Sequence, residues 1–370
     1  MHPNQERSAC ARCYADLSIS NRLVEGEHVV TAKDVADRAG TSTAVVSYVF
    51  NNGPRNVAPT TREKVLLAAT ELNYHPNALA RALSFGRTLS VGLIVPDIAN
   101  RFFGELARAL EEAAATHGNL LLIGDSGLNL EREQSHVAAF VERRVDSVVM
   151  VSLSDTPDLR PFTEAGIPIA VLHPVDPGQQ TSSISIDYRA AAQAATAHLL
   201  EHGYRSIALL NGPHESAGSR QHREGFFRAV QAHEQPVETV ELQTEISRAH
   251  AAQVALDILA RPSRPRAFYC STDEQAHGVM FACHRLGLAI PDDIAVTGFD
   301  GTEHSAYTFP PLTTVRQPVA DMAERVLTLL AKRTETPVHE TASFELVVRE
   351  SCGKHDEKLV QVTIAQRPDS

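Results

Sequence analysis

The spacing of apolar residues changes near residue 90, and the change predicts two kinds of structure. Before it, apolar positions recur at helical intervals in three short stretches. After it, short apolar runs alternate with amphipathic stretches such as 102–117 and 190–202. Buried strands joined by helices are typical of parallel sheets. The strands are expected at 91–95, 120–123, 147–151, 169–172, 184–186, 207–210, 267–270 and 294–297.

The first two helical stretches have recognisable ends. Thr31, followed by the acidic Asp34, favours a first helix that Gly40 ends after two turns. Ser42 then favours a second N-terminus directly after the glycine turn. Two short helices joined by a tight turn are typical of a helix-turn-helix, although a small helical bundle used for dimerisation has the same pattern.

A third helix is expected behind these two. Thr60-x-x-Glu63 is a capping box that predicts a helix running to Leu72. In such a unit Ala36 has to be small where the first two helices cross, and Val46 fills the space between them. The second helix would then present its N-terminal residues to the major groove of DNA.

The charge distribution changes how the composition is interpreted. The 370 residues, 43% of them hydrophobic, suffice for two or three domains, and the net charge of −11 argues against a nucleic-acid partner. Residues 31–88, however, hold seven Lys/Arg against four Asp/Glu, a net charge of +3. A small basic head on a large acidic body is compatible with DNA binding by the head alone.

Cysteines and targeting signals point to the cytoplasm. Five cysteines are an odd number, which suits a reducing compartment. Cys10-x-x-Cys13 is half of a zinc site at most, because no second pair follows, and an inert extension is favoured for residues 1–28. The 17 histidines are interpreted as lacking metal-ligand spacing, so neither a metal nor a cofactor is expected. No apolar run reaches the roughly 18 residues of a membrane helix, and no secretory signal is visible.

The order of motifs resembles the LacI/GalR family of bacterial transcription regulators. The head carries Thr31-Ala-Lys-Asp-Val-Ala-x-x-Ala-Gly-x-Ser42 and, farther on, Leu72-Asn-Tyr-x-Pro-Asn-Ala-Leu-Ala-Arg-x-Leu83. The body carries Val91-Gly-Leu-Ile-Val-Pro-Asp97 and Pro291-Asp-Asp-Ile-Ala-Val-x-Gly-Phe-Asp300, with similar segments at 311–318 and 346–351. The resemblance covers residues 31–351.

The resemblance implies roles for residues of the head. Thr43, Ala44 and Tyr48 would read base edges, while Ser42, Ser47 and Asn51 would contact the DNA backbone. Residues 77–83 would form a hinge helix whose leucine enters the minor groove at the centre of a palindromic operator. The implied DNA-binding residues are Thr31, Ser42, Thr43, Ala44, Ser47, Tyr48, Asn51, Asn77, Arg81 and Leu83.

The resemblance also implies an effector site between two lobes, at the carboxyl ends of the strands. The candidates are Phe102, Phe103, Asp155, Arg220, His222, Thr272, Asp273 and Asp300, with Asp97 and His173 nearby. Only one of the two phenylalanines is expected to face the ligand. His222 occupies the place of an arginine that grips sugar hydroxyls in family members, and Thr272 replaces a frequent asparagine. These departures count against an ordinary sugar, and they predict a pH-dependent contact from His222.

Together these features predict an α/β chain that regulates transcription. We expect an N-terminal extension (1–28), an all-α helix-turn-helix domain (29–75), a hinge helix and linker (76–88), a periplasmic-binding-protein-like body of two doubly wound parallel sheets (89–351) and a tail (352–370). The expected function is that of a homodimeric repressor of palindromic operator DNA, controlled by a sugar or other metabolite. No phosphate loop, dinucleotide fingerprint, nucleophile elbow or zinc-protease motif supports an enzyme. The alternative is a solute-binding or enzymatic protein of the same body fold that does not act on DNA.

Overall fold

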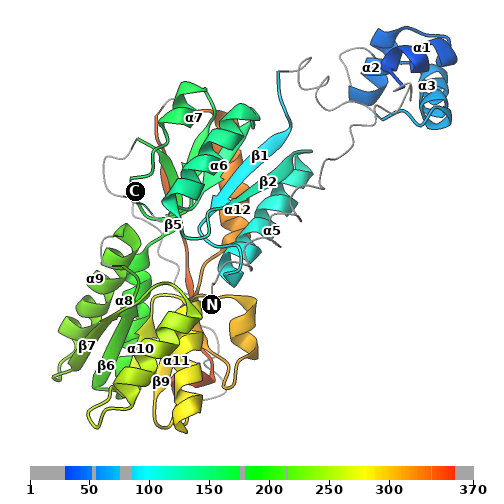
Figure 1. Cartoon of the computed structure of the whole chain (residues 1–370). Coiled ribbons are helices and arrows are strands. Elements are labelled where there is room, and N and C mark those ends of the chain that lie inside the picture. Colours follow the sequence, from blue (N-terminus) through cyan, green and yellow to red (C-terminus); the bar gives the residue numbers. More distant parts are fainter. Residues whose placement is uncertain are drawn as a thin grey trace, which may run out of the picture. The chain divides into compact units, whose positions relative to one another are not determined.

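The chain divides into two compact units, residues 1–81 and 82–370. The structure, a computed structural model, describes residues 30–51, 56–75, 86–152, 154, 156–175, 180–213, 216–334 and 336–354. We call residues 30–75 the head and residues 86–354 the body, and each is described by itself (Figure 1). Within the described residues, no helix has the length and apolarity needed to cross a membrane.

The head consists of three helices, α1 (Ala32–Ala39), α2 (Thr43–Asn51) and α3 (Pro59–Glu71). The predicted start of α1 is confirmed, and it is a capping box: the Thr31 hydroxyl accepts from Asp34 N and the Asp34 carboxylate accepts from Thr31 N. Gly40 ends the helix in the left-handed conformation, with φ at 66°, which explains the glycine there. The predicted turn between α1 and α2 is therefore confirmed.

The predicted start of the third helix is wrong by two residues, because Thr60 was expected as the N-cap and Ala58 holds that position. The helix begins at Pro59 after Ala58, which makes no side-chain cap, so Thr60-x-x-Glu63 is not a capping box. Proline at the first helical position has φ preset for the helix and lacks the N–H that would go unpaired. The three helices enclose a small core, which includes the predicted Ala36–Val46 crossing: Val35, Ala36, Val46, Val49, Val65, Ala68 and Ala69.

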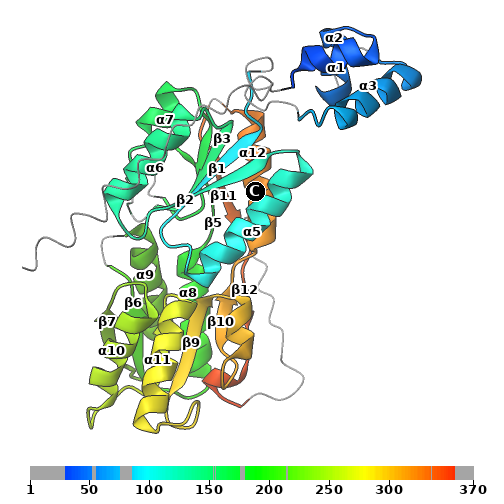
Figure 2. The same ribbon diagram turned by 45° about the vertical axis from the view of Figure 1, so that its right-hand side comes forward.

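The first lobe of the body is a six-stranded sheet in the order β11-β5-β4-β3-β1-β2, with every pair parallel. Helices cover both faces, as Figure 2 shows. Its elements are β1 (Ser90–Val95), α5 (Arg101–Thr116), β2 (Leu120–Asp125), α6 (Leu130–Glu142), β3 (Ser147–Met150), α7 (Arg160–Glu164), β4 (Ile169–Val171), β5 (Ser182–Ile186), α12 (Val319–Lys332) and β11 (His339–Ala342).

The second lobe repeats this design in the order β12-β10-β9-β8-β6-β7, with only β12 antiparallel to its neighbour. Its elements are α8 (Tyr188–Glu201), β6 (Ser206–Asn211), α9 (Ala217–Ala232), β7 (Glu238–Gln243), α10 (Arg248–Leu259), β8 (Ala267–Cys270), α11 (Asp273–Leu286), β9 (Ala295–Asp300), the 3₁₀ helix η1 (Glu303–Tyr307), β10 (Thr313–Arg316), β12 (Glu345–Val347) and the 3₁₀ helix η2 (Glu350–Cys352).

The chain crosses between the lobes three times. The crossings follow β5, β10 and β11, so residues 187, 317–318 and 343–344 connect the two sheets. The expected two-lobed α/β body is thereby confirmed. Two lobes joined by three short connections form the hinge on which such folds open and close around a ligand.

Candidate functional site

A cavity of about 540 Å³ lies between the two lobes. The carboxyl ends of strands from both sheets meet there, together with the N-terminal ends of the helices that follow them. Polar lining residues include Asp97, Asn100, His173, Tyr188, His222, Thr272 and Asp300. A cavity of this size fits one small molecule.

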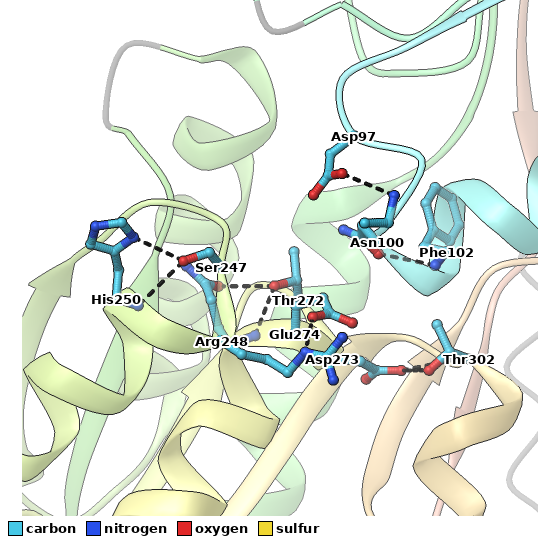
Figure 3. Close-up of polar contacts among 12 residues, drawn as sticks. Asp97, Asn100, Phe102, Ser247, Arg248, His250, Thr272, Asp273, Glu274 and Thr302 are labelled. Atoms are coloured by element: carbon cyan, nitrogen blue, oxygen red, sulfur yellow. Dashed lines mark hydrogen bonds and ion pairs between the residues drawn. The ribbon is translucent and has the colours of Figure 1, made fainter. Parts of the chain in front are cut away.

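The lobe 1 wall is formed by the loop between β1 and α5. The Asn100 side chain caps α5 by accepting from Phe102 N at 3.0 Å, and Asp97 Oδ1 accepts from Ala99 N at 2.9 Å (Figure 3). Phe102 and Phe103 pack edge to face, with ring centroids 5.3 Å apart. Both rings line the cavity, so the expectation that one of them would belong only to the core is corrected.

His222 lies on α9 in the lobe 2 wall and is 4% exposed. Its Nδ1 lies 2.6 Å from the Tyr269 hydroxyl, and its ring packs against Tyr188 and Phe299. Burial lowers the pKa of His222 to about 3. The ring is therefore neutral at physiological pH, and the predicted pH-dependent contact is wrong for that range.

Neither of the arginines beside His222 is among the described residues that line the cavity. Arg220, a predicted effector residue, is partly exposed and is not among the lining residues. Arg223 pairs with Glu241 at 3.0 Å and stacks over Phe227. Helical geometry places these side chains on other faces of α9 than His222, so neither substitutes for it.

Asp273 is the second predicted residue that the structure moves out of the site. It is 1% exposed at the start of α11, outside the cavity lining. One oxygen accepts from the backbone and the hydroxyl of Thr302, both at 2.9 Å, and from Ser305 Oγ at 2.7 Å. The other accepts from Thr314 Oγ1 at 2.6 Å. Burial raises the pKa of Asp273. This carboxylate joins the loop after β9 and strand β10 to α11, and no capacity remains for a ligand.

Thr272 precedes Asp273 and reaches the cavity. Its hydroxyl caps α11 by accepting from Gln275 N at 3.2 Å (Figure 3). The hydroxyl oxygen of Thr272 is thus already hydrogen-bonded within the helix, which leaves little of its hydrogen-bonding capacity for a ligand.

Asp300, at the end of β9, lines the cavity and is 7% exposed. Its backbone has a φ of 112°, which is rare for a residue with a side chain and turns the chain sharply at the strand end. Oδ1 accepts from Gln317 Nε2 at 3.0 Å, and the Asp300 carbonyl accepts from Gln317 N at 3.2 Å. Burial, followed by the charge of Asp273, raises the pKa of Asp300 well above its ordinary value.

These contacts connect the cavity to the interlobe crossings. Gln317 is the first residue of the second crossing, and Tyr188 directly follows the first. Tyr188 and Phe299 are lining residues that the sequence did not single out. Their position next to strand ends was the available signal. Asp155 lies outside the described residues.

The described lining residues include two carboxylates, Asp97 and Asp300, but no lysine or arginine. Aromatic rings come from both lobes: Phe102, Phe103, Tyr188 and Phe299. This cavity accommodates a ring-shaped ligand between apolar faces and disfavours an anion, whose charge would remain unpaired.

In the head, α2 separates a buried face from an exposed one. Val46 and Val49 are buried, whereas Thr43, Ala44 and Ser47 are exposed and Tyr48 is partly exposed. The predicted base-reading residues therefore share the exposed part of one helix.

The remaining predicted DNA contacts have mixed placements. Thr31 caps α1, and Ser42 Oγ accepts from Val45 N at 3.3 Å, so both side chains stand at helix N-termini, where a phosphate can also bind. The Asn51 side chain, Asn77, Arg81 and Leu83 lie outside the described residues.

Two family descriptions match this chain. Residues 31–77 match "Bacterial regulatory proteins, lacI family", and residues 196–352 match "Periplasmic binding protein-like domain". The HTH-type transcriptional repressor PurR of Vibrio vulnificus is 33% identical over 333 residues, 88% of this chain and 99% of that protein. The ribose operon repressor of Halalkalibacterium halodurans is 34% identical over 327 residues, 87% of this chain and 97% of that protein.

Solved structures give the same picture. A lac repressor dimer bound to operator and the anti-inducer ONPF matches with a TM-score of 0.77 and 27% identity, over 88% of this chain and 99% of that one. A transcriptional regulator CelR–cellobiose complex matches with a TM-score of 0.65 and 26% identity, over 87% of this chain and 99% of that one.

Proposed function

Because the chain belongs to the lacI family of bacterial regulatory proteins and is a DNA-binding transcriptional regulator, we propose that it is a dimeric repressor whose operator affinity is set by a small molecule bound between its lobes. The observation that carries this proposal is the contact of Asp300 with Gln317. A ligand that bonds Asp300 contacts the same carboxylate that holds Gln317 of the interlobe crossing, so binding is coupled to the angle between the lobes.

The effector is uncharged or cationic and contains a ring. Phe102 and Phe103 offer one aromatic wall, and Tyr188 and Phe299 offer another. Asp300 accepts a hydrogen bond from a hydroxyl, amine or ring N–H of the ligand, and neutral His222 orients it. Phosphorylated metabolites and carboxylic acids are disfavoured because no cation of the described lining compensates their charge.

The dimer forms through apolar residues that the described body leaves exposed. Leu120 and Ile123 are 64% and 48% exposed on the edge strand β2, and Phe281 and Phe309 are 53% and 96% exposed in lobe 2. Burying such side chains against a second copy is the usual source of dimer stability. Two copies related by a two-fold axis then present two heads to a palindromic operator.

In the DNA complex, Thr43, Ala44 and Tyr48 read base edges in the major groove. Leu83 wedges into the minor groove between the half-sites. We expect Leu83→Ala to weaken operator binding in a gel-shift titration while leaving effector binding intact. Operator affinity equal to that of the unchanged chain would contradict the wedge.

A ligand screen on the full-length chain tests the effector proposal. Sugars, nucleosides, ring-bearing amines and phosphorylated metabolites are compared by the shift they cause in the melting temperature. A ligand at 100 times its Kd stabilises the protein by about 2.7 kcal/mol. We expect neutral or cationic ring compounds to raise the melting temperature and Asp300→Asn to abolish the rise. A rise with phosphorylated compounds alone would contradict the proposed effector class.

A further inference from the structure

Three side chains with nitrogen and sulfur donors meet in lobe 2, away from the effector cavity lining. His198 and His202 lie one turn apart near the end of α8, and Cys352 is the last residue of η2. One ligand atom of each lies within 4.8 Å of the others. His198 Nε2 is 3.3 Å from Cys352 Sγ, and the centroids of the two imidazole rings are 4.7 Å apart. The cysteine, at least 150 positions from either histidine along the chain, therefore lies beside both of them.

The sulfur is held by an ordered network. Ser351 Oγ accepts from Thr313 N at 2.8 Å and donates to Val296 O at 2.6 Å, which fixes the turn before Cys352 to the sheet. Thr313 Oγ1 lies 2.9 Å from Cys352 Sγ and 3.1 Å from Arg349 O, and its single hydrogen is donated to the sulfur when Cys352 is a thiolate. A hydroxyl that supports a ligand atom in this way is typical of the surroundings of metal sites.

Gly353 brings the chain close to the second histidine. Its φ is 145°, and an added Cβ would lie 2.6 Å from His202 Nδ1. Only glycine permits the backbone to come this close to His202, so a glycine at position 353 lets the His202 imidazole lie beside the sulfur.

We propose that His198, His202 and Cys352 bind a transition metal that prefers nitrogen and sulfur ligands, with Zn²⁺ as the best fit. Two histidines at positions i and i+4 of a helix present their rings to one ion. Tetrahedral zinc separates a nitrogen from a sulfur ligand by about 3.6 Å, close to the 3.3 Å between His198 and Cys352. Ca²⁺ and Mg²⁺ prefer oxygen ligands and do not suit this set.

The bound ion joins α8 to the C-terminal segment of lobe 2. The histidines are partly exposed while the cysteine is buried, so water takes the fourth position of the ion from the histidine side. The i,i+4 pair corrects the expectation that the histidines lack metal-ligand spacing. The proposal does not depend on the identity of the effector or of the operator.

Cobalt substitution in the full-length chain is the test. Cys10 and Cys13 are first changed to serine in every protein, so that the N-terminal pair cannot contribute a thiolate. The chain is stripped with a chelator and titrated with Co²⁺, and a thiolate-to-cobalt charge-transfer band reports coordination by sulfur. Competition with a chromophoric chelator then gives the affinity for Zn²⁺.

We expect one ion per chain with a charge-transfer band. Cys352→Ser removes the band, and His198→Asn or His202→Asn weakens Zn²⁺ binding by at least about tenfold. Cys283→Ser, a buried cysteine outside the cluster, leaves the band unchanged. If Cys352→Ser fails to fold, the Zn²⁺ affinities of the two variants at the partly exposed histidines decide whether the site exists. Absence of the band in the parent chain, its persistence in Cys352→Ser, or unaltered Zn²⁺ affinity in both histidine variants overturns the proposal.

Discussion

The two lobes of the body share one architecture but contribute differently to the cavity between them. Lobe 1 supplies phenylalanine rings on a capped helix, whereas lobe 2 supplies most of the polar side chains. Within lobe 2, two buried aspartates lie near the ends of neighbouring strands. The two carboxylate oxygens of Asp273 accept four hydrogen bonds inside the lobe. Asp300 instead faces the cavity, and its carboxylate accepts one hydrogen bond from Gln317. Position at a strand end thus makes a residue a candidate, and its remaining hydrogen-bonding capacity decides whether it can bind a ligand.

Among the substitutions that test this difference between the two aspartates, Asp273→Ala is expected to have the largest effect. Asp273→Ala leaves buried donors of Thr302, Ser305 and Thr314 without their acceptor. We expect the free energy of unfolding to fall by at least about 3 kcal/mol in a denaturant titration. Asp273→Asn, which keeps an accepting oxygen, loses less. A fully stable alanine variant would show that this network is unimportant to lobe 2.

The next effect is the acid sensitivity caused by His222. Its pKa falls to about 3 in the folded chain, against about 6.5 when unfolded. The unfolded chain therefore binds a proton that the folded chain excludes, and stability is lost as pH falls from 6.5 toward 3. Between these pH values, we expect the free energy of unfolding of His222→Gln to fall by a few kcal/mol less than that of the unchanged chain. Parallel curves for the two proteins would contradict a buried neutral His222.

Asp300→Asn has its main effect on the ligand. Because the raised pKa makes the charged carboxylate unfavourable above its unfolded pKa, the variant at pH 7 is at least as stable as the unchanged chain. We expect the affinity for the effector found by the screen to fall by about 10- to 100-fold in calorimetry. Unchanged affinity with the same ligand would remove Asp300 from the site.

The smallest effect concerns a direct bond between the lobes. Glu105 on α5 accepts from Glu303 N of η1 at 2.9 Å, in an exposed position. Such a bond contributes little, so Glu105→Ala changes effector affinity by about two- to threefold. A change as large as that of Asp300→Asn would mean that the interlobe bond, rather than the cavity wall, controls binding.

Periodicity predicted the central strands of both sheets, because strands buried on both faces appear as continuous apolar runs. It missed β7 and β11 at sheet edges, where exposed positions interrupt the run, and β10, whose buried Thr313 and Thr314 are polar. In the head, Gly40 and Thr31 were informative because each has a local backbone function.

The candidate site was predicted only in part. Phe102, His222, Thr272 and Asp300 line the cavity, but Arg220 and Asp273 do not. Asp273 is excluded by its tertiary hydrogen bonds, and Arg220 by its position around the axis of α9. Neither property can be predicted from the fact that a residue follows a strand. Pairing of His198 with Cys352 across the fold was equally invisible to local spacing.

The account is tested most directly by measuring operator affinity as the effector is added. The operator is first selected from a random DNA pool with the full-length chain, and we expect an inverted repeat whose binding weakens steeply with salt. Fluorescence anisotropy at fixed salt then gives the operator Kd across an effector titration. The account predicts a shift of roughly 5- to 150-fold in the unchanged chain, with the midpoint displaced to higher effector concentration in Asp300→Asn. An operator Kd that stays constant while the effector saturates the cavity would contradict it.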